Sequence, residues 1–92
     1  MQEVYGIAAF RSRQQVLLLE NSLRREGISA RVITTPRDVA LGCGLSVRFD
    51  MADMDRGGRA IRAQRPTNLV GVYRVENHTG ARPKLTPIGI YR

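Results

Sequence analysis

The chain has 92 residues, of which 42% are apolar, and its fifteen Lys and Arg outnumber eight Asp and Glu to give a net charge of +7. This length and composition predict one globular domain and exclude a disordered chain. No apolar run approaches the ~18 residues that a membrane span needs, so we expect a cytoplasmic protein without a signal peptide.

The first elements are predicted to be a strand and a helix. Residues 4–10 are apolar at both alternating sets of positions, which is typical of a central strand. Ser12, with Gln15 three residues later, matches the pattern of a helix N-cap. The helix should end at Gly27, because glycine readily adopts the left-handed conformation that follows a last helical turn.

The residue pattern in the middle of the chain predicts two more strands, separated by a loop. Residues 29–34 form the second strand, which Pro36 ends because proline has no N–H to donate. The third strand covers residues 45–49, where apolar residues alternate with Ser46 and Arg48. This alternation indicates a half-buried strand, with the two polar residues on its exposed side.

A second helix and a fourth strand follow. Asp50 and Asp53 suit the cap and first turn of a helix, because carboxylates there meet free N–H groups. Gly57-Gly58 weakens this helix, and either close packing against a sheet or local mobility would explain the two glycines. The helix should end before Pro66, and residues 69–75 form the fourth strand.

The element order β-α-β-β-α-β predicts an α+β, ferredoxin-like fold, with a four-stranded antiparallel sheet and both helices on one face. This domain covers residues 1–75. Residues 76–92 form a C-terminal extension that begins with a turn at 76–80 and then becomes apolar. We expect the extension to pack on the open sheet face or on a second subunit of a homo-oligomer, because strand 4–10 is apolar on both sides.

Cys43 is the only cysteine of the chain and its one candidate nucleophile. In the predicted fold its loop lies at the sheet end where the first helix begins, so the positive end of the helix dipole should point towards it. Cations and a helix N-terminus lower the pKa of a thiol, so we expect a reactive thiolate. The residues expected to support the anion are Arg37, Gly42, Gly44, Arg11 and Ser12. The alternative is a small buried cysteine that packs under the loop, and the residues alone leave both open.

The basic charge supports a second class of function. A positive protein favours an acidic partner such as nucleic acid or an acidic protein face. Four arginines recur every three residues on the predicted second helix, although a solvated helix face explains them equally well: Arg56, Arg59, Arg62 and Arg65. The alternative function is therefore a non-catalytic interaction module that binds RNA or an acidic protein, with Cys43 structural.

Metal and cofactor chemistry have little support in the sequence. His78 is the only histidine, and a single cysteine permits neither an internal disulfide nor a cysteine-rich metal cage. A glycine-rich phosphate loop is also absent, because Gly42-Cys43-Gly44 opens a predicted strand, whereas a dinucleotide fingerprint opens a helix. We expect no metal and no cofactor.

One motif of the chain is specific. It consists of Pro36-Arg37, five further residues, and the strand opening Cys43-Gly44-Leu45-Ser46-Val47-Arg48-Phe49. Through this motif, and more weakly through Gly71-Val72-Tyr73-Arg74-Val75, residues 4–75 resemble the small bacterial selenium/sulfur carrier protein-like family. The resemblance implies that Cys43 carries sulfur or selenium as a persulfide or selenopersulfide. The protein would then be a stoichiometric carrier and not an enzyme, loaded by a donor such as a cysteine desulfurase and unloaded by an acceptor protein.

Overall fold

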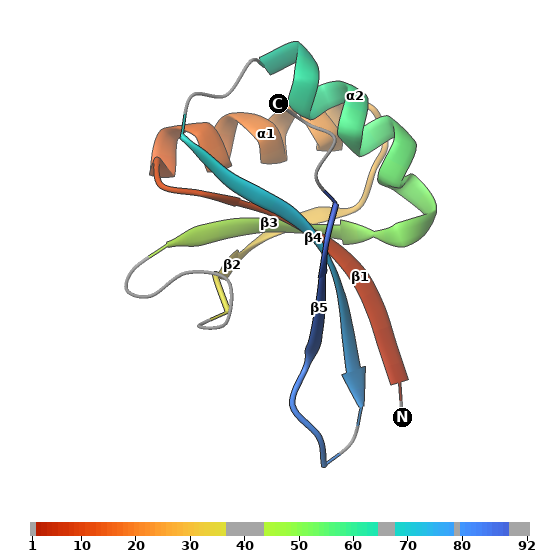
Figure 1. Cartoon of the computed structure of the whole chain (residues 1–92). Helices are drawn as coiled ribbons and strands as arrows, with labels where there is room; N and C mark the ends of the chain where they lie inside the picture. The colour runs from red at the N-terminus through yellow and green to blue at the C-terminus, as the bar shows by residue number, and fades with distance from the viewer. Residues whose placement is uncertain (1, 37–43, 65–67, 79, 89–92) are drawn as a thin grey trace.

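A computed structural model of the chain describes residues 2–36, 44–64, 68–78 and 80–88. These residues form two α-helices, one short 3-10 helix and five strands (Figure 1). The elements in chain order are β1 (Gln2–Phe10), α1 (Arg13–Arg25), β2 (Ala30–Thr34), β3 (Leu45–Asp50), η1 (Met51–Asp53), α2 (Met54–Gln64), β4 (Leu69–His78) and β5 (Lys84–Pro87).

The strands form one antiparallel sheet in the order β2-β3-β1-β4-β5, and both helices cover the same face of it (Figure 1). The α+β class and the two predicted crossover units are confirmed. The predicted count of four strands is wrong, because the C-terminal extension adds a fifth strand beside β4.

The error arose at the end of β4. The polar residues from Glu76 onward were predicted to form a turn, but β4 continues to His78, and Glu76 pairs across the strands with Lys84 of β5. Opposite charges at directly paired positions stabilise such a ladder. The turn lies further along the chain, where Gly80 adopts a φ of 77° that favours glycine. The resulting hairpin extends away from the helices (Figure 1).

The main core lies between the helices and the sheet. The predicted apolar face of α1, formed by Val16, Leu19 and Leu23, is fully buried and packs with Phe10 and Phe49 of the sheet. Close packing explains Gly57 of α2, because a Cβ on it would lie 3.3 Å from Phe49 Cε2.

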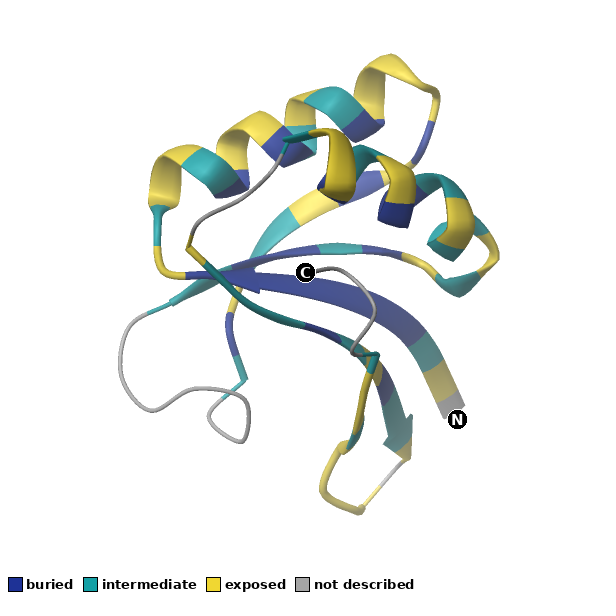
Figure 2. Ribbon diagram, turned by 45° about the horizontal axis from the view of Figure 1, so that its top comes forward, coloured by how far each residue is buried: buried dark blue, intermediate teal, exposed yellow. Residues whose placement is uncertain are grey.

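A second, smaller cluster lies on the sheet face away from the helices. Tyr5, Ile7 and Val75 are buried there, and Leu85 of β5 packs against them. β1 is consequently buried along most of its length (Figure 2). Ser46, predicted to lie on an exposed side, is 0% exposed. The sequence pattern failed at Ser46 because Ser46 pairs with the buried Ala9 near the end of β1 and its hydroxyl bonds to the buried Thr35.

The second helix begins slightly later than expected. Asp50 precedes η1 and makes no side-chain capping hydrogen bond, and the α-helix proper begins at Met54. Asp53 and Asp55 nevertheless place carboxylates near the start of the helical segment, where free N–H groups favour them. Within the described residues, neither helix is long and apolar enough to span a membrane.

Candidate functional site

The candidate site is the β2–β3 connection, which carries the only cysteine. Cys43, Arg37 and Gly42 lie outside the described residues. The structure does describe the two ends of this connection, and it describes the predicted supporting residues Gly44, Arg11 and Ser12.

The two ends of the connection pack closely together at Thr35 and Gly44, and we call these two residues its base. The backbone N–H of Thr35 donates a hydrogen bond to the Gly44 carbonyl at 2.9 Å. A Cβ at Gly44 would lie 3.1 Å from Thr35 Oγ1 and 3.7 Å from the Phe10 carbonyl oxygen. A side chain at position 44 would therefore require Thr35 to move, which gives this glycine a packing role. The residue directly before Gly44, Cys43, is joined to this base by one peptide bond.

Two buried hydroxyls support the base. The side chains of Thr35 and Ser46 are 5% and 0% exposed, and their oxygens share a hydrogen bond of 2.7 Å. Removing one hydroxyl would leave the other without its partner, at a cost of about 1–3 kcal/mol. Sequence reasoning missed this pair, because the hydroxyls come together only through the register of β2 with β3.

The start of α1 lies at the same end of the sheet. Phe10, the last residue of β1, pairs with Leu45 of β3, directly after Gly44. Ser12 caps α1 as predicted, since its side chain accepts a hydrogen bond from the Gln15 N–H at 3.4 Å. The start of α1 thus lies at the sheet end where the connection returns to β3 at Gly44, while the predicted proximity of the helix start to Cys43 falls outside the described residues.

The helix start is electropositive. The first turn of α1 contains no acidic residue, and the exposed arginines Arg11 and Arg13 flank Ser12. The backbone N–H of Arg11 donates to the Asn68 carbonyl at 2.8 Å, which ties this junction to the start of β4. Arginine at a helix N-terminus is unfavourable for the helix itself. The dipole of α1 would favour an anion placed at the start of this helix.

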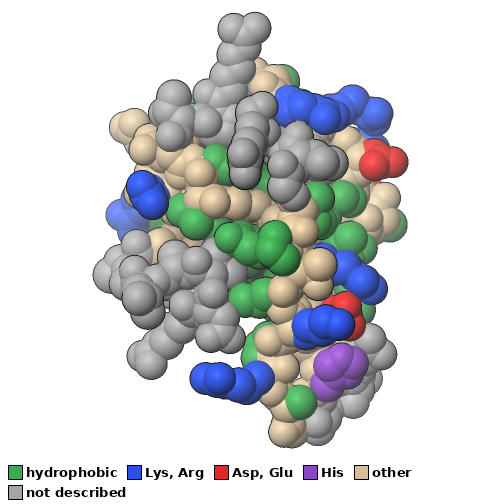
Figure 3. All heavy atoms as spheres, viewed as in Figure 1, with side chains coloured by type: hydrophobic (Ala, Val, Ile, Leu, Met, Phe, Trp, Pro, Cys, Tyr) green, Lys and Arg blue, Asp and Glu red, His purple; other side chains and the backbone are tan. Residues whose placement is uncertain are grey.

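The arginines of α2 do not form one binding stripe. Arg56 donates to the Glu26 carbonyl and lies 3.7 Å from Asp53, so its charge is used within the fold. Arg59 and Arg62 are exposed, and Arg65 lies outside the described residues. On the face shown in Figure 3, Lys and Arg side chains are spread around a band of hydrophobic side chains.

Metal ligation finds no support in the part of the chain that the structure describes. No three His, Cys, Asp or Glu side chains gather there as a metal site would require. His78 lies exposed at the end of β4, and its Nε2 is 3.9 Å from a Glu76 carboxylate oxygen.

Comparison with known proteins gives one match. The model of a family described as "Putative Se/S carrier protein-like" matches residues 5–69, which run from within β1 to the first residue of β4 and include the whole β2–β3 connection. No curated protein and no solved structure matches the chain.

Proposed function

The chain belongs to the Se/S carrier protein-like family, and from this premise we propose that it carries sulfur or selenium on Cys43. The observation that carries the proposal is the family match over residues 5–69, which spans the connection containing the only cysteine. The interaction-module alternative is not favoured, because it would make that cysteine structural.

The proposed reaction is a transfer of sulfane sulfur between thiols. The Cys43 thiolate attacks the terminal sulfur of a persulfide on a donor enzyme such as a cysteine desulfurase. A new S–S bond forms at Cys43, the S–S bond of the donor breaks, and its electron pair leaves with the donor thiolate. An acceptor protein thiolate then removes the sulfur in the same way. No external oxidant or reductant is consumed, and selenium would follow the same route as a selenopersulfide.

Two features of the described residues support this chemistry. The Thr35–Gly44 hydrogen bond and the Thr35–Ser46 hydroxyl pair anchor the base of the connection immediately beside Cys43. The same sheet end carries Arg11, Arg13 and the N-terminus of α1. Positive charge favours a thiolate and a terminal persulfide anion. A single cysteine has no neighbouring thiol in its own chain to discharge the load.

The carrier role also sets the expected cellular setting. The protein would act in stoichiometric amounts, with catalysis supplied by the donor enzyme. A carrier thiol that must stay reduced between cycles fits the cytoplasm, where thiols are kept reduced.

Intact-mass measurement tests the proposal. The protein is incubated with a cysteine desulfurase and free cysteine, and its mass should increase by one sulfur atom. The added sulfur should be lost on treatment with dithiothreitol, and Cys43→Ser should gain nothing. A protein whose Cys43 alkylates readily but never gains sulfur from a desulfurase or selenium from a selenopersulfide donor would contradict the carrier function.

A further inference from the structure

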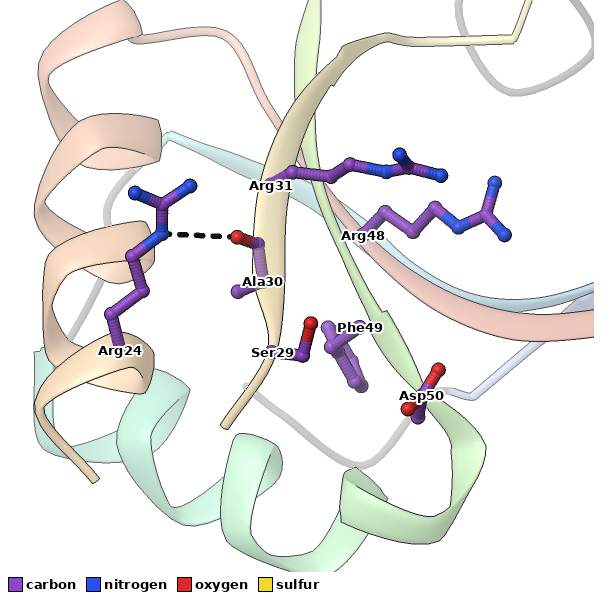
Figure 4. A pocket seen from close by; sticks show the side chains of 7 residues that line it. All are labelled: Arg24, Ser29, Ala30, Arg31, Arg48, Phe49 and Asp50. Carbon is purple, nitrogen blue, oxygen red and sulfur yellow. Dashed lines mark hydrogen bonds between the residues drawn. The ribbon is translucent and has the colours of Figure 1, made fainter. Parts of the chain in front are cut away.

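A hollow lined by arginines lies at the free edge of β2. It has a volume of about 440 Å³, and Arg24, Arg31 and Arg48 line it together with Ser29 and Asp50 (Figure 4). It lies where β2 begins and β3 ends, whereas the Cys43 connection joins the opposite ends of these strands. The hollow therefore lies at the other end of these two strands from the described ends of that connection.

Two of these arginines are direct neighbours across the sheet. Arg31 of β2 pairs in register with Arg48 of β3, so both side chains leave the sheet on the same face. Figure 4 shows them extending in the same direction from adjacent strands. Like charges at directly opposite positions destabilise a strand pair. A fold that keeps two arginines together is therefore stabilised when an anion lies between or beside their guanidinium groups.

Arg48 is held in a fixed orientation. Its guanidinium lies 3.8 Å from the centre of the Tyr5 ring, and Tyr5 is only 8% exposed. Stacking on a buried ring holds the guanidinium plane and leaves its N–H groups available at the edge, which is the geometry that binds an oxyanion with two parallel hydrogen bonds.

One carboxylate already binds the N–H groups at the edge of the Arg48 guanidinium. Arg48 Nη2 donates to Glu3 Oε2 at 3.1 Å, and the Glu3 side chain is 52% exposed. Because Glu3 lies near the start of β1 and its side chain is half exposed, it can turn away into water. Glu3 is thus a built-in competitor for any external anion at Arg48.

The other two arginines differ in their availability. Arg24 donates from Nε to the Ala30 carbonyl at 3.1 Å and lies 3.3 Å from Glu20. Its contribution to the hollow is therefore mainly its positive electrostatic field, and not a direct hydrogen bond to a ligand. Arg31 is exposed and makes no hydrogen bond or ion pair within the described residues. Asp50 also lines the hollow and opposes anion binding, and Glu20 and Glu3 pair with Arg24 and Arg48. Arg31 is therefore the arginine of the hollow whose charge is not offset by an ion pair among the described residues.

We propose that Arg31 and Arg48 bind the phosphoryl group of a small phosphorylated metabolite. Two adjacent guanidinium groups suit a dianion with several acceptor oxygens. The volume of about 440 Å³ exceeds the needs of a bare phosphate and lies within the range of small-molecule sites. Ser29 supplies an additional hydroxyl donor at the rim. Binding displaces Glu3 from Arg48.

The test measures affinity for three probes by calorimetry and by backbone-amide NMR at fixed ionic strength: inorganic phosphate, pyrophosphate and glucose 6-phosphate. Wild type should bind at least one, with shifts centred on residues 29–31 and 48–50. Arg31→Gln should weaken binding by about tenfold or more, because charge-assisted hydrogen bonds are lost. Arg31→Lys should weaken binding less than Arg31→Gln does, since lysine keeps the positive charge but lacks the forked pair of guanidinium donors.

The decisive variant is one that gains affinity. Glu3→Gln removes the internal competitor and should bind the probe several-fold more tightly, a result that partial unfolding could not produce. Arg82→Gln, which removes one exposed positive charge elsewhere, is the matched control and should leave binding unchanged, as should Cys43→Ser.

Three results would overturn the proposal. The first is no binding of any probe to wild type or Glu3→Gln at millimolar concentration. The second is an equal loss in Arg31→Gln and Arg82→Gln, which would indicate attraction by net charge alone. The third is tighter binding of a single-stranded RNA oligonucleotide than of every small probe through the same arginines, which would assign the site to nucleic acid.

Discussion

At the scale of single residues, the Glu3 carboxyl group is strongly influenced by a neighbouring arginine. The Arg48 guanidinium lowers the pKa of Glu3 below its ordinary value of 4.5, first through their hydrogen bond and then through its charge, and Asn77 adds a weaker hydrogen bond. A carboxyl group with a depressed pKa stabilises the folded state above its unfolded-state pKa. That contribution is complete above pH 4.5 and is lost as the pH falls through the lowered folded-state value.

We therefore predict that NMR titration of the Glu3 side-chain carboxyl carbon gives a midpoint below 4.5 in wild type. In Arg48→Gln the midpoint should rise towards the ordinary value, whereas Arg82→Gln should leave it unchanged. Because the pair is exposed, added salt should reduce the difference. Identical midpoints in wild type and Arg48→Gln would show that the ion pair is not populated in solution.

Cys43 provides a second prediction at this scale. Its alkylation by iodoacetamide should proceed without denaturant and at a lower pH than alkylation of free cysteine, because nearby positive charge favours the thiolate. Arg37→Ala should shift the labelling profile to higher pH, and Arg11→Ala should do so more weakly, since an exposed guanidinium is partly screened. A profile at or above that of free cysteine, or labelling only after unfolding, would assign Cys43 to a structural role.

Residue chemistry was partly predictable from the sequence. The Ser12 cap followed from local spacing, because a cap bonds to a residue three positions away. The Thr35–Ser46 and Glu3–Arg48 contacts did not, since they join residues 11 and 45 positions apart. Such pairs depend on the register of neighbouring strands, which periodicity within one strand does not determine.

At the scale of elements, one phenylalanine sets the distance between α2 and the sheet. Phe49 is 1% exposed and lies between Gly6 of β1 and Gly57 of α2. A Cβ at Gly6 would lie 2.7 Å from Phe49 Cε2 and 2.9 Å from Met54 Cε, while a Cβ at Gly57 would lie 3.3 Å from the same ring. The two glycines thus face one ring with different clearances.

We predict that Gly6→Ala destabilises the protein by about 1–3 kcal/mol, because a buried ring must shift to accept the methyl group. Gly57→Ala should change stability by less than about 1 kcal/mol, since alanine gains roughly that amount in helix propensity and offsets a milder contact. Urea unfolding of both variants measures the difference. Equal destabilisation by the two substitutions would contradict the clearances around Phe49.

The elements themselves were largely predictable. Both helices and the first three strands appear close to their predicted ranges, because each has a clear apolar period and a clear stop at glycine, proline or a capping residue. The end of β4 and the whole of β5 were not predicted. Their residues are mostly polar or exposed, and β5 exists only through pairing with β4. A strand of this kind has little pattern of its own for sequence reasoning to detect.

At the scale of the whole molecule, the C-terminal extension changes the edge of the sheet. β5 pairs with β4 over four residue pairs, from Tyr73↔Pro87 to Glu76↔Lys84. Leu85 packs on the cluster of Tyr5, Ile7 and Val75, and Ile88 packs against the helix-side core. The extension therefore performs two tasks, one through its backbone and one through its apolar side chains.

These two tasks can be separated by mutation. A chain truncated after His78 loses both the β5 ladder and the contact of Leu85, so β4 becomes an edge strand with unpaired N–H and C=O groups. We predict that this truncation lowers the urea midpoint and makes the protein self-associate, as observed by sedimentation velocity.

Leu85→Ser keeps the β4–β5 ladder but removes the apolar contact. It should lower stability by about 1–3 kcal/mol, less than the full cost of a fully buried leucine because Leu85 is only partly buried, and it should leave the protein in its wild-type assembly state. An exposed strand edge and an exposed apolar patch both promote association. Comparing the truncated chain with Leu85→Ser therefore identifies which of the two β5 prevents from causing association. Self-association of Leu85→Ser to the same extent as the truncated chain would show that the apolar cover, and not the protected edge, controls assembly.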